Sequence, residues 1–282
     1  MTDRTRATEP AGPRRAAVLG SPIAHSLSPV LHRAAFAALG LGAWSYDRFE
    51  IDEEALPGFL EGLGPEWAGL SLTMPLKRAV MPLLDEISDT AASVEAVNTV
   101  VLTGDGRRIG DNTDIPGLVA ALRESGVGAV DSASILGAGA TASSAVAALS
   151  GLGVQDIVAY VRSEARAAEM RGWGERLGVN VKTVDWSQAQ AAFESPLVVA
   201  TTPKGATDTL KERLPSEVGT LFDVLYDPWP TALAAAWQQR GGAVLSGLDL
   251  LVHQAVHQFG LFTGDSRSPL AAMRQAGLDA LR

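Results

Sequence analysis

Short runs of apolar residues, each bounded by Gly or Pro, recur along the chain. These runs are typical of buried strands, and they read AAVLG, AGLSL, NTVVL, ASILG, DIVAYV, PLVVA, TLFDVLY and GAVLSG. Stretches rich in Ala and Leu lie between them, for example residues 29–39, 141–149 and 231–240. Strands that alternate with helices are typical of parallel sheets with crossover helices. The pattern therefore predicts an α/β protein.

A second strand–turn–helix unit opens in the middle of the chain, at SASILGAGATASSAVAALSGLG in residues 132–153. We therefore predict two domains: an N-terminal α/β domain over residues 15–117 and a Rossmann-like dinucleotide-binding domain over residues 118–246. The remaining residues, 247–282, are rich in helix formers. From the pattern alone, they could belong to either domain.

The composition narrows the classes of partner. Hydrophobic residues make up 46% of the 282 residues and the net charge is −9, so the chain has no basic surface for nucleic acid or an anionic membrane. The absence of cysteine excludes disulfides and thiolate centres. Residues 1–15 lack the apolar core of a signal peptide, and no later stretch is apolar for long enough to span a membrane. We expect a cytoplasmic protein with small-molecule partners, either a monomer or a homodimer.

A glycine turn follows the strand SASIL and has the form G-x-G-x-x-A. Glycine at its first two fixed positions lets backbone N–H groups approach a pyrophosphate, and the final alanine lets the next helix pack closely on the strand. The N-terminus of that helix then faces the phosphates. We expect cofactor contacts from Gly137, Ala138, Gly139, Ala140, Thr141 and Ala142.

The next strand, DIVAY, ends at VRSEAR, where an NAD site usually carries an acid for the ribose 2′-hydroxyl. Arg162, Ser163 and Arg166 stand there instead, and a guanidinium group suits a 2′-phosphate, so the segment favours NADP. Two alternatives stay open. A shift of two residues would bring Glu164 to the ribose, and both arginines could be solvated charges at the start of a helix.

Four polar clusters precede the glycine turn: HSLSP, SLTMPLK, EAVNTV and GDNTDIPG. Each lies at a strand end or a turn, where rigid elements can point side chains into a common cleft. Taken singly, each has a plain structural interpretation. Thr73 could cap a helix, Asn98 could belong to a turn, Lys77 could be a surface charge and Asp114 could open a helix.

In their residues and in their order along the chain, these clusters resemble the shikimate dehydrogenase family. The resemblance runs from about Val18 to Gly264 and includes GSPIAHSLSPVLH, LTMPLK, AVNTV, GDNTDIPG, the glycine turn, LYDPWPT and GLDLLVHQA. It implies an oxidoreductase that reversibly reduces 3-dehydroshikimate to shikimate with NADPH, in the shikimate pathway of aromatic amino-acid biosynthesis. It also implies a substrate domain and a Rossmann domain that face each other across a cleft, with residues 247–282 returning to the first domain.

The resemblance also implies roles for individual residues. Lys77 would be the catalytic proton donor, and Asp114 would hold it in place and keep it charged. The substrate carboxylate would bind Ser26 and Ser28. The substrate ring would be surrounded by Thr73, Lys77, Asn98, Asp114 and Gln254, with Tyr226 nearby. Further cofactor contacts are expected from Thr201 and Gly247.

Other readings remain at this stage. A quinate or quinate/shikimate dehydrogenase that uses NAD is one alternative, and a non-catalytic ligand sensor is another, although a sensor should have lost Lys77 or Asp114. The chain also departs from the family pattern, because Val161 and Ala200 replace common asparagines. His253 and His257 lie four residues apart, a zinc-like spacing, but Gln254 stands where a zinc-protease helix needs Glu and no third ligand is evident, so we expect no metal.

Overall fold

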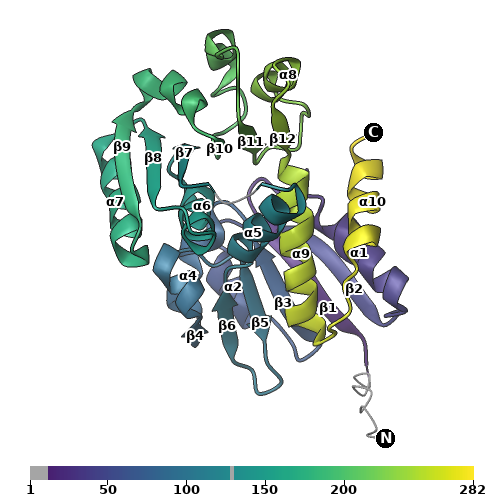
Figure 1. Cartoon of the computed structure of the whole chain (residues 1–282). Coiled ribbons are helices and arrows are strands. Elements are labelled where there is room, and N and C mark those ends of the chain that lie inside the picture. The colour runs from purple at the N-terminus through teal and green to yellow at the C-terminus, as the bar shows by residue number, and fades with distance from the viewer. Residues whose placement is uncertain (1–11, 128–129) are drawn as a thin grey trace, which may run out of the picture.

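Two six-stranded sheets organise the described residues, 12–127 and 130–282, of this computed structural model (Figure 1). The first sheet has the strand order β2-β1-β3-β5-β6-β4, and the second has the order β12-β11-β10-β7-β8-β9. The strands of the first sheet are β1 (Arg14–Gly20), β2 (Trp44–Glu50), β3 (Trp67–Leu72), β4 (Glu86–Ile87), β5 (Thr99–Leu102) and β6 (Arg108–Asp111).

The first sheet is mixed. Strand β1 pairs in parallel with β2 and β3, whereas β5 runs antiparallel to both β3 and β6. The reason is local: only residues 103–107 separate β5 from β6, and Gly106 in that turn has a φ of 85°, so the two strands form a hairpin with no crossover helix. The helices of this half are α1 (Ser28–Leu39), α2 (Leu56–Glu61), α3 (Leu76–Ala79), α4 (Asp89–Val94) and the 3₁₀ helix η1 (Met81–Leu83).

The second sheet is parallel throughout, and its order is that of a Rossmann fold. Its strands are β7 (Ser132–Leu136), β8 (Asp156–Val161), β9 (Asn180–Asp185), β10 (Leu197–Ala200), β11 (Thr220–Asp223) and β12 (Ala243–Leu245). Its helices are α6 (Ala140–Gly151), α7 (Glu164–Leu177), α8 (Ala232–Gln239), η2 (Trp186–Glu194) and η3 (Asp208–Arg213). The strand order reverses direction between β7 and β10. Ligands of such sheets bind at this switch point, and the glycine turn follows β7 there.

Helices α5 (Asp114–Glu124) and α9 (Gly247–Thr263) connect the two halves, and α10 (Leu270–Ala280) packs on α1 and α9 (Figure 1). Helices α9 and α10 pack on the first sheet, where Phe259 and Met273 share a hydrophobic cluster with Val18 of β1. Helix α5 crosses α9 closely, because a Cβ on Gly117 would lie 2.9 Å from the backbone nitrogen of Gln254. The C-terminal helices therefore lie against the first sheet, as the resemblance implied. The exact domain bounds stay a prediction.

No helix in the described part of the chain is long and apolar enough to cross a membrane.

Candidate active site

A pocket lies where the two halves meet, and its lining includes every substrate residue expected from the sequence. Those residues are Ser26, Ser28, Thr73, Lys77, Asn98, Asp114, Tyr226 and Gln254. Thr141, at the start of α6, and Gly247, at the start of α9, line the same pocket. Residues from several segments that are distant in sequence therefore converge on one cavity, and two of the expected cofactor contacts border it.

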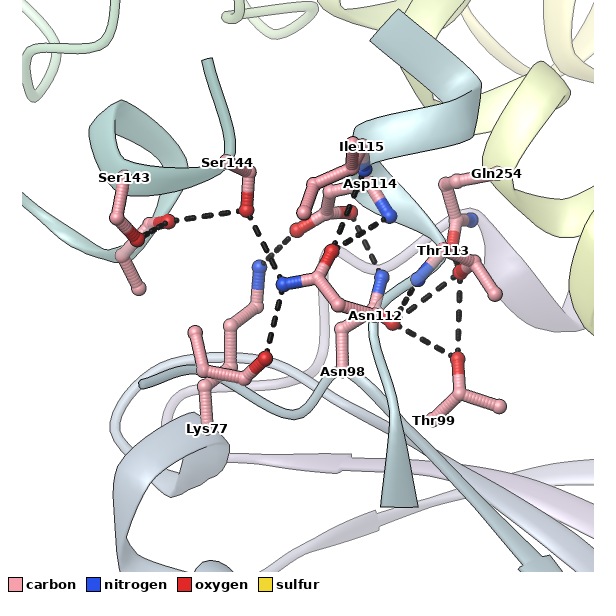
Figure 2. A network of polar contacts seen from close by, with 12 residues as sticks. Lys77, Asn98, Thr99, Asn112, Thr113, Asp114, Ile115, Ser143, Ser144 and Gln254 are labelled. Carbon is pink, nitrogen blue, oxygen red and sulfur yellow. Dashed lines mark hydrogen bonds and ion pairs between the residues drawn. The ribbon is translucent and has the colours of Figure 1, made fainter. Parts of the chain in front are cut away.

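Lys77 and Asp114 form an ion pair at this pocket, with 2.6 Å between Nζ and Oδ2 (Figure 2). The short helix α3 follows the end of β3 and carries Lys77, whereas Asp114 is the first residue of α5. Their side chains are only 14% and 9% exposed. The other carboxylate oxygen of Asp114 accepts a hydrogen bond of 2.8 Å from Nδ2 of Asn98. A buried carboxylate needs such partners, so both oxygens hold fixed positions.

Asn98 is itself held in one orientation. Its Oδ1 accepts hydrogen bonds of 2.8 Å from the hydroxyl of Thr99 and from the backbone N–H of Thr113 (Figure 2). Only its Nδ2 is then left to face Asp114, and a donor there matches the acceptor on the carboxylate.

Sequence reasoning missed Asn112, although it lies within the quoted cluster GDNTDIPG. Its Oδ1 accepts from the backbone N–H of Asp114 at 3.0 Å, and its Nδ2 donates to the carbonyl oxygen of Ala96 at 2.8 Å. The same Nδ2 donates to Oγ of Ser144 in α6, at 3.2 Å. Asn112 therefore ties the turn that carries Asp114 to the first helix of the Rossmann half (Figure 2).

A buried polar network that reaches the pocket lining at Ser71 and Gln258 was also missed. Gln258 donates to the Thr99 hydroxyl at 2.9 Å and accepts from Ser71 at 2.8 Å, and Ser71 in turn accepts from Tyr46 at 2.6 Å. His32 stacks on the Tyr46 ring with 4.1 Å between centroids. Complete burial lowers the pKa of His32 to about 3, against the opposing effect of its hydrogen bond to Gln258, so this imidazole is neutral.

The glycine turn has the close contacts that a dinucleotide loop requires. Gly137 has a φ of 114°, and a Cβ there would lie 2.6 Å from Oγ1 of Thr201. Thr201 donates to the carbonyl oxygen of Leu136 at 3.0 Å, which places this expected cofactor residue beside the turn. Ala142 is fully buried, as close packing of α6 requires. A Cβ on Gly247 would lie 2.0 Å from the carbonyl oxygen of Val224, so that position also requires glycine.

The expected 2′-phosphate residues lie together where β8 ends and α7 begins. Ser163 caps α7 by accepting from the backbone N–H of Arg166, whose guanidinium group pairs with Glu169 at 2.7 Å. The guanidinium carbon of Arg162 lies 4.9 Å from the centre of the Trp186 ring. Glu164, the residue that kept NAD as an alternative cofactor, pairs with Arg171 at 2.5 Å, and its side chain is 82% exposed.

The two departures from the family pattern lie inside the core of the Rossmann half. Val161, at the end of β8, is 5% exposed, and Ala200, at the end of β10, is 1% exposed. Each belongs to a hydrophobic cluster there. At both positions the side chain contributes to apolar packing.

The histidines of α9 have structural surroundings. Nε2 of His253 lies 2.8 Å from a carboxylate oxygen of Glu124, and Arg274 of α10 pairs with the same carboxylate. These hydrogen bonds, with that of Arg274 the larger influence, lower the pKa of Glu124 to about 2. Burial lowers the pKa of His257. The absence of a metal stays an expectation from the sequence.

Comparison with known proteins identifies the family of this chain. The family model described as shikimate dehydrogenase substrate binding domain matches residues 18–100, and that described as shikimate 5'-dehydrogenase C-terminal domain matches residues 247–276. The shikimate dehydrogenase (NADP(+)) of Oleidesulfovibrio alaskensis is 36% identical over 274 residues, which cover 94% of each chain. The chain belongs to the shikimate dehydrogenase family. The α/β fold with a Rossmann-like half, predicted from the sequence, is confirmed.

Solved structures agree with this membership of the shikimate dehydrogenase family. The shikimate dehydrogenase of Mycobacterium tuberculosis is 43% identical, with a TM-score of 0.86 over 95% of this chain and 100% of that one. The Thermus thermophilus enzyme in complex with NADP(H) and shikimate is 35% identical, with a TM-score of 0.84 over 95% and 100%. A quinate dehydrogenase of Corynebacterium glutamicum in complex with NAD is 30% identical, with a TM-score of 0.86 over 95% and 99%.

Proposed function

We propose that this protein catalyses the reversible NADPH-dependent reduction of 3-dehydroshikimate to shikimate, in the shikimate pathway of aromatic amino-acid biosynthesis. The observation that carries the proposal is the Lys77–Asp114 ion pair, which borders a polar pocket beside the N-terminus of the helix that follows the glycine turn. An acid or base held in a cleft next to a dinucleotide site suits hydride transfer to a carbonyl.

The pocket suits a small acid that carries several hydroxyl groups. Its polar lining consists mainly of neutral hydroxyl and amide groups, which can both donate and accept hydrogen bonds. Among the described lining residues, Lys77 is the one Lys or Arg, and it already faces Asp114. We infer that Ser26 and Ser28 bind the substrate carboxylate and that Thr73, Asn98, Gln254 and Tyr226 surround the ring.

Lys77 performs the proton transfer in this proposal. Bound NADPH supplies the hydride that the substrate carbonyl carbon accepts. The carbonyl oxygen then becomes an alkoxide, and the ammonium group of Lys77 stabilises that charge and donates a proton to it. Asp114 holds Nζ of Lys77 at 2.6 Å, and Asn98 holds Asp114 from the other side. In the reverse direction, Lys77 accepts the proton from the substrate hydroxyl.

The glycine turn fits the pyrophosphate of NADP, and the start of α7 fits its 2′-phosphate. The turn has no side chains at Gly137 and Gly139, which leaves room for a pyrophosphate. Since the N–H of Gly137 donates to the carbonyl oxygen of Tyr160, we infer that the pyrophosphate binds backbone N–H groups at the start of α6. We infer that Arg162, Ser163 and Arg166 bind the 2′-phosphate, since two guanidinium groups can share its charge. The exposed Glu164 pairs with Arg171, which argues against its use as a ribose ligand for NAD.

A direct assay tests the proposal and its alternatives together. Initial rates of nicotinamide reduction should be measured with NADP⁺ and with NAD⁺, each with shikimate and with quinate. We expect the highest kcat/KM for NADP⁺ with shikimate. A higher value for NAD⁺ with quinate would support the quinate dehydrogenase alternative, and no turnover despite shikimate binding would support a ligand sensor.

We also infer that the protein acts in the cytoplasm on small molecules alone, as a monomer or a homodimer. The absence of cysteine and the net charge of −9 support this inference. Light scattering during size-exclusion chromatography distinguishes the two assembly states.

A further inference from the structure

The loop that carries both candidate carboxylate ligands, residues 24–28 and here called the serine loop, is held by strand β2. Arg48 of that strand donates from Nη1 to the carbonyl oxygen of Ala24 and, at 3.5 Å, to that of Ser26.

The charge around the pocket makes this support relevant to substrate binding. Lys77, the one Lys or Arg in the described lining, pairs with Asp114 and is assigned to the reacting carbonyl. The substrate carboxylate then relies on the donors of the serine loop, which include His25 in the pocket lining, and on charge behind the loop. Arg48 can supply that charge: among residues 12–127 and 130–282, no carboxylate forms an ion pair with it, whereas Arg33 pairs with Asp47.

Arg48 also fixes the direction of the loop peptides. In a trans peptide the C=O and the following N–H point in opposite directions. Since the carbonyl groups of Ala24 and Ser26 point toward Arg48, the N–H groups of His25 and Leu27 point away from it. A guanidinium group bound to both carbonyls also polarises those peptides and makes their N–H groups better donors to an anion.

We propose that Arg48 is a positioning residue for the substrate carboxylate. It holds the backbone of the serine loop from the solvent side. This inference rests on the proposed function, because it takes the ligand of the serine loop to be the carboxylate of shikimate.

The test replaces Arg48 by Met, which keeps the apolar stem and removes the guanidinium group. We expect the KM for shikimate to rise about three- to tenfold, the scale of one lost charge-assisted contact that is partly screened by solvent. Values of kcat and of the KM for NADP⁺ should stay within about twofold, since Arg48 does not line the pocket. Arg48→Lys should recover part of the loss, because it keeps the positive charge but not the planar guanidinium group.

Arg33→Met is the matched control. It removes the same charge from the same surface, but Arg33 contacts the carbonyl oxygen of Tyr46 and the carboxylate of Asp47 rather than the serine loop. We expect its KM for shikimate to stay near the wild-type value. Equal effects of the two substitutions would reduce the role of Arg48 to general surface charge and would contradict the proposal.

The methyl ester of shikimate separates carboxylate recognition from a merely structural role. Because the ester lacks the negative charge, Arg48→Met should weaken binding of the ester less than binding of shikimate. Equal losses for both ligands, or an unchanged KM for shikimate, would overturn the inference while leaving the proposed function intact. Wild-type protein that neither binds nor oxidises shikimate would overturn both.

Discussion

Replacement of Lys77 by Met is the most informative perturbation of the candidate active site. A positioned acid or base accelerates proton transfer by about 10²- to 10⁴-fold, so we expect kcat to fall by that factor, equivalent to about 3–5 kcal/mol of activation free energy. Lys77 contacts Asp114 rather than the serine loop, so the KM for shikimate should change much less than kcat. The assay is the initial rate of NADP⁺ reduction at saturating shikimate.

We expect this substitution to lower the stability as well. It leaves the Asp114 carboxylate 9% exposed, with the amide of Asn98 as its remaining side-chain donor in the described residues. Removing one partner of a fully buried ion pair costs about 3–5 kcal/mol, but this pair borders an open pocket, so we expect about 1–2 kcal/mol. A lower Tm alone could then reduce the measured rate.

The double variant Lys77→Met/Asp114→Asn separates the two effects. It removes both charges, so the unpaired carboxylate disappears and most of the lost Tm should return. Activity should stay as low as in the single variant, because the proton donor is still missing. A Lys77→Met enzyme within twofold of the wild-type kcat, or a double variant that regains activity with its Tm, would refute the catalytic assignment.

Three further substitutions test other parts of the molecule. Ser28→Ala should raise the KM for shikimate by the equivalent of about 1–3 kcal/mol with little change in kcat, and an unchanged KM there and in Ser26→Ala would place the carboxylate elsewhere. Arg162→Ala should raise the KM for NADP⁺ about ten- to a hundredfold and leave that for NAD⁺ nearly unchanged, as kinetics with each cofactor would show. Glu124→Gln should lower the Tm at neutral pH. Because the pKa of Glu124 falls from 4.5 to about 2 on folding, its contribution is present above pH 4.5 and is lost as the pH falls toward 2, so thermal melts of both proteins should converge there.

The elements that could be predicted from the sequence are those with local signals. The strand SASIL, the glycine turn and the helix after it appear as β7, the turn at Gly137 and α6. The mixed pairing of the first sheet could not be predicted in the same way, since an apolar run such as NTVVL does not reveal the direction of its neighbour. The short turn at Gly106 is the local signal for the hairpin, and it is weak without the strands on either side.

The site depended on a different kind of information. The single clusters were ambiguous, and only their order along the chain, through the family resemblance, related Lys77 to Asp114. The network around Gln258 was beyond such reasoning, because its partner His32 lies 226 positions away in the chain. No periodicity or spacing connects residues so distant, and only tertiary packing brings them together.

The distribution of charge explains why this site is mostly neutral. Each buried ion carries a desolvation cost, whereas amide and hydroxyl groups can be fully paired with one another at much lower cost. The network from Tyr46 through Ser71 and Gln258 is uncharged, and complete burial keeps His32 neutral as well. Within the described lining of the pocket, the Lys77–Asp114 pair carries the one carboxylate and the one Lys or Arg, and it lies where a proton must move. A neutral network can therefore form hydrogen bonds with the hydroxyl groups of a substrate without competing with that pair for its proton.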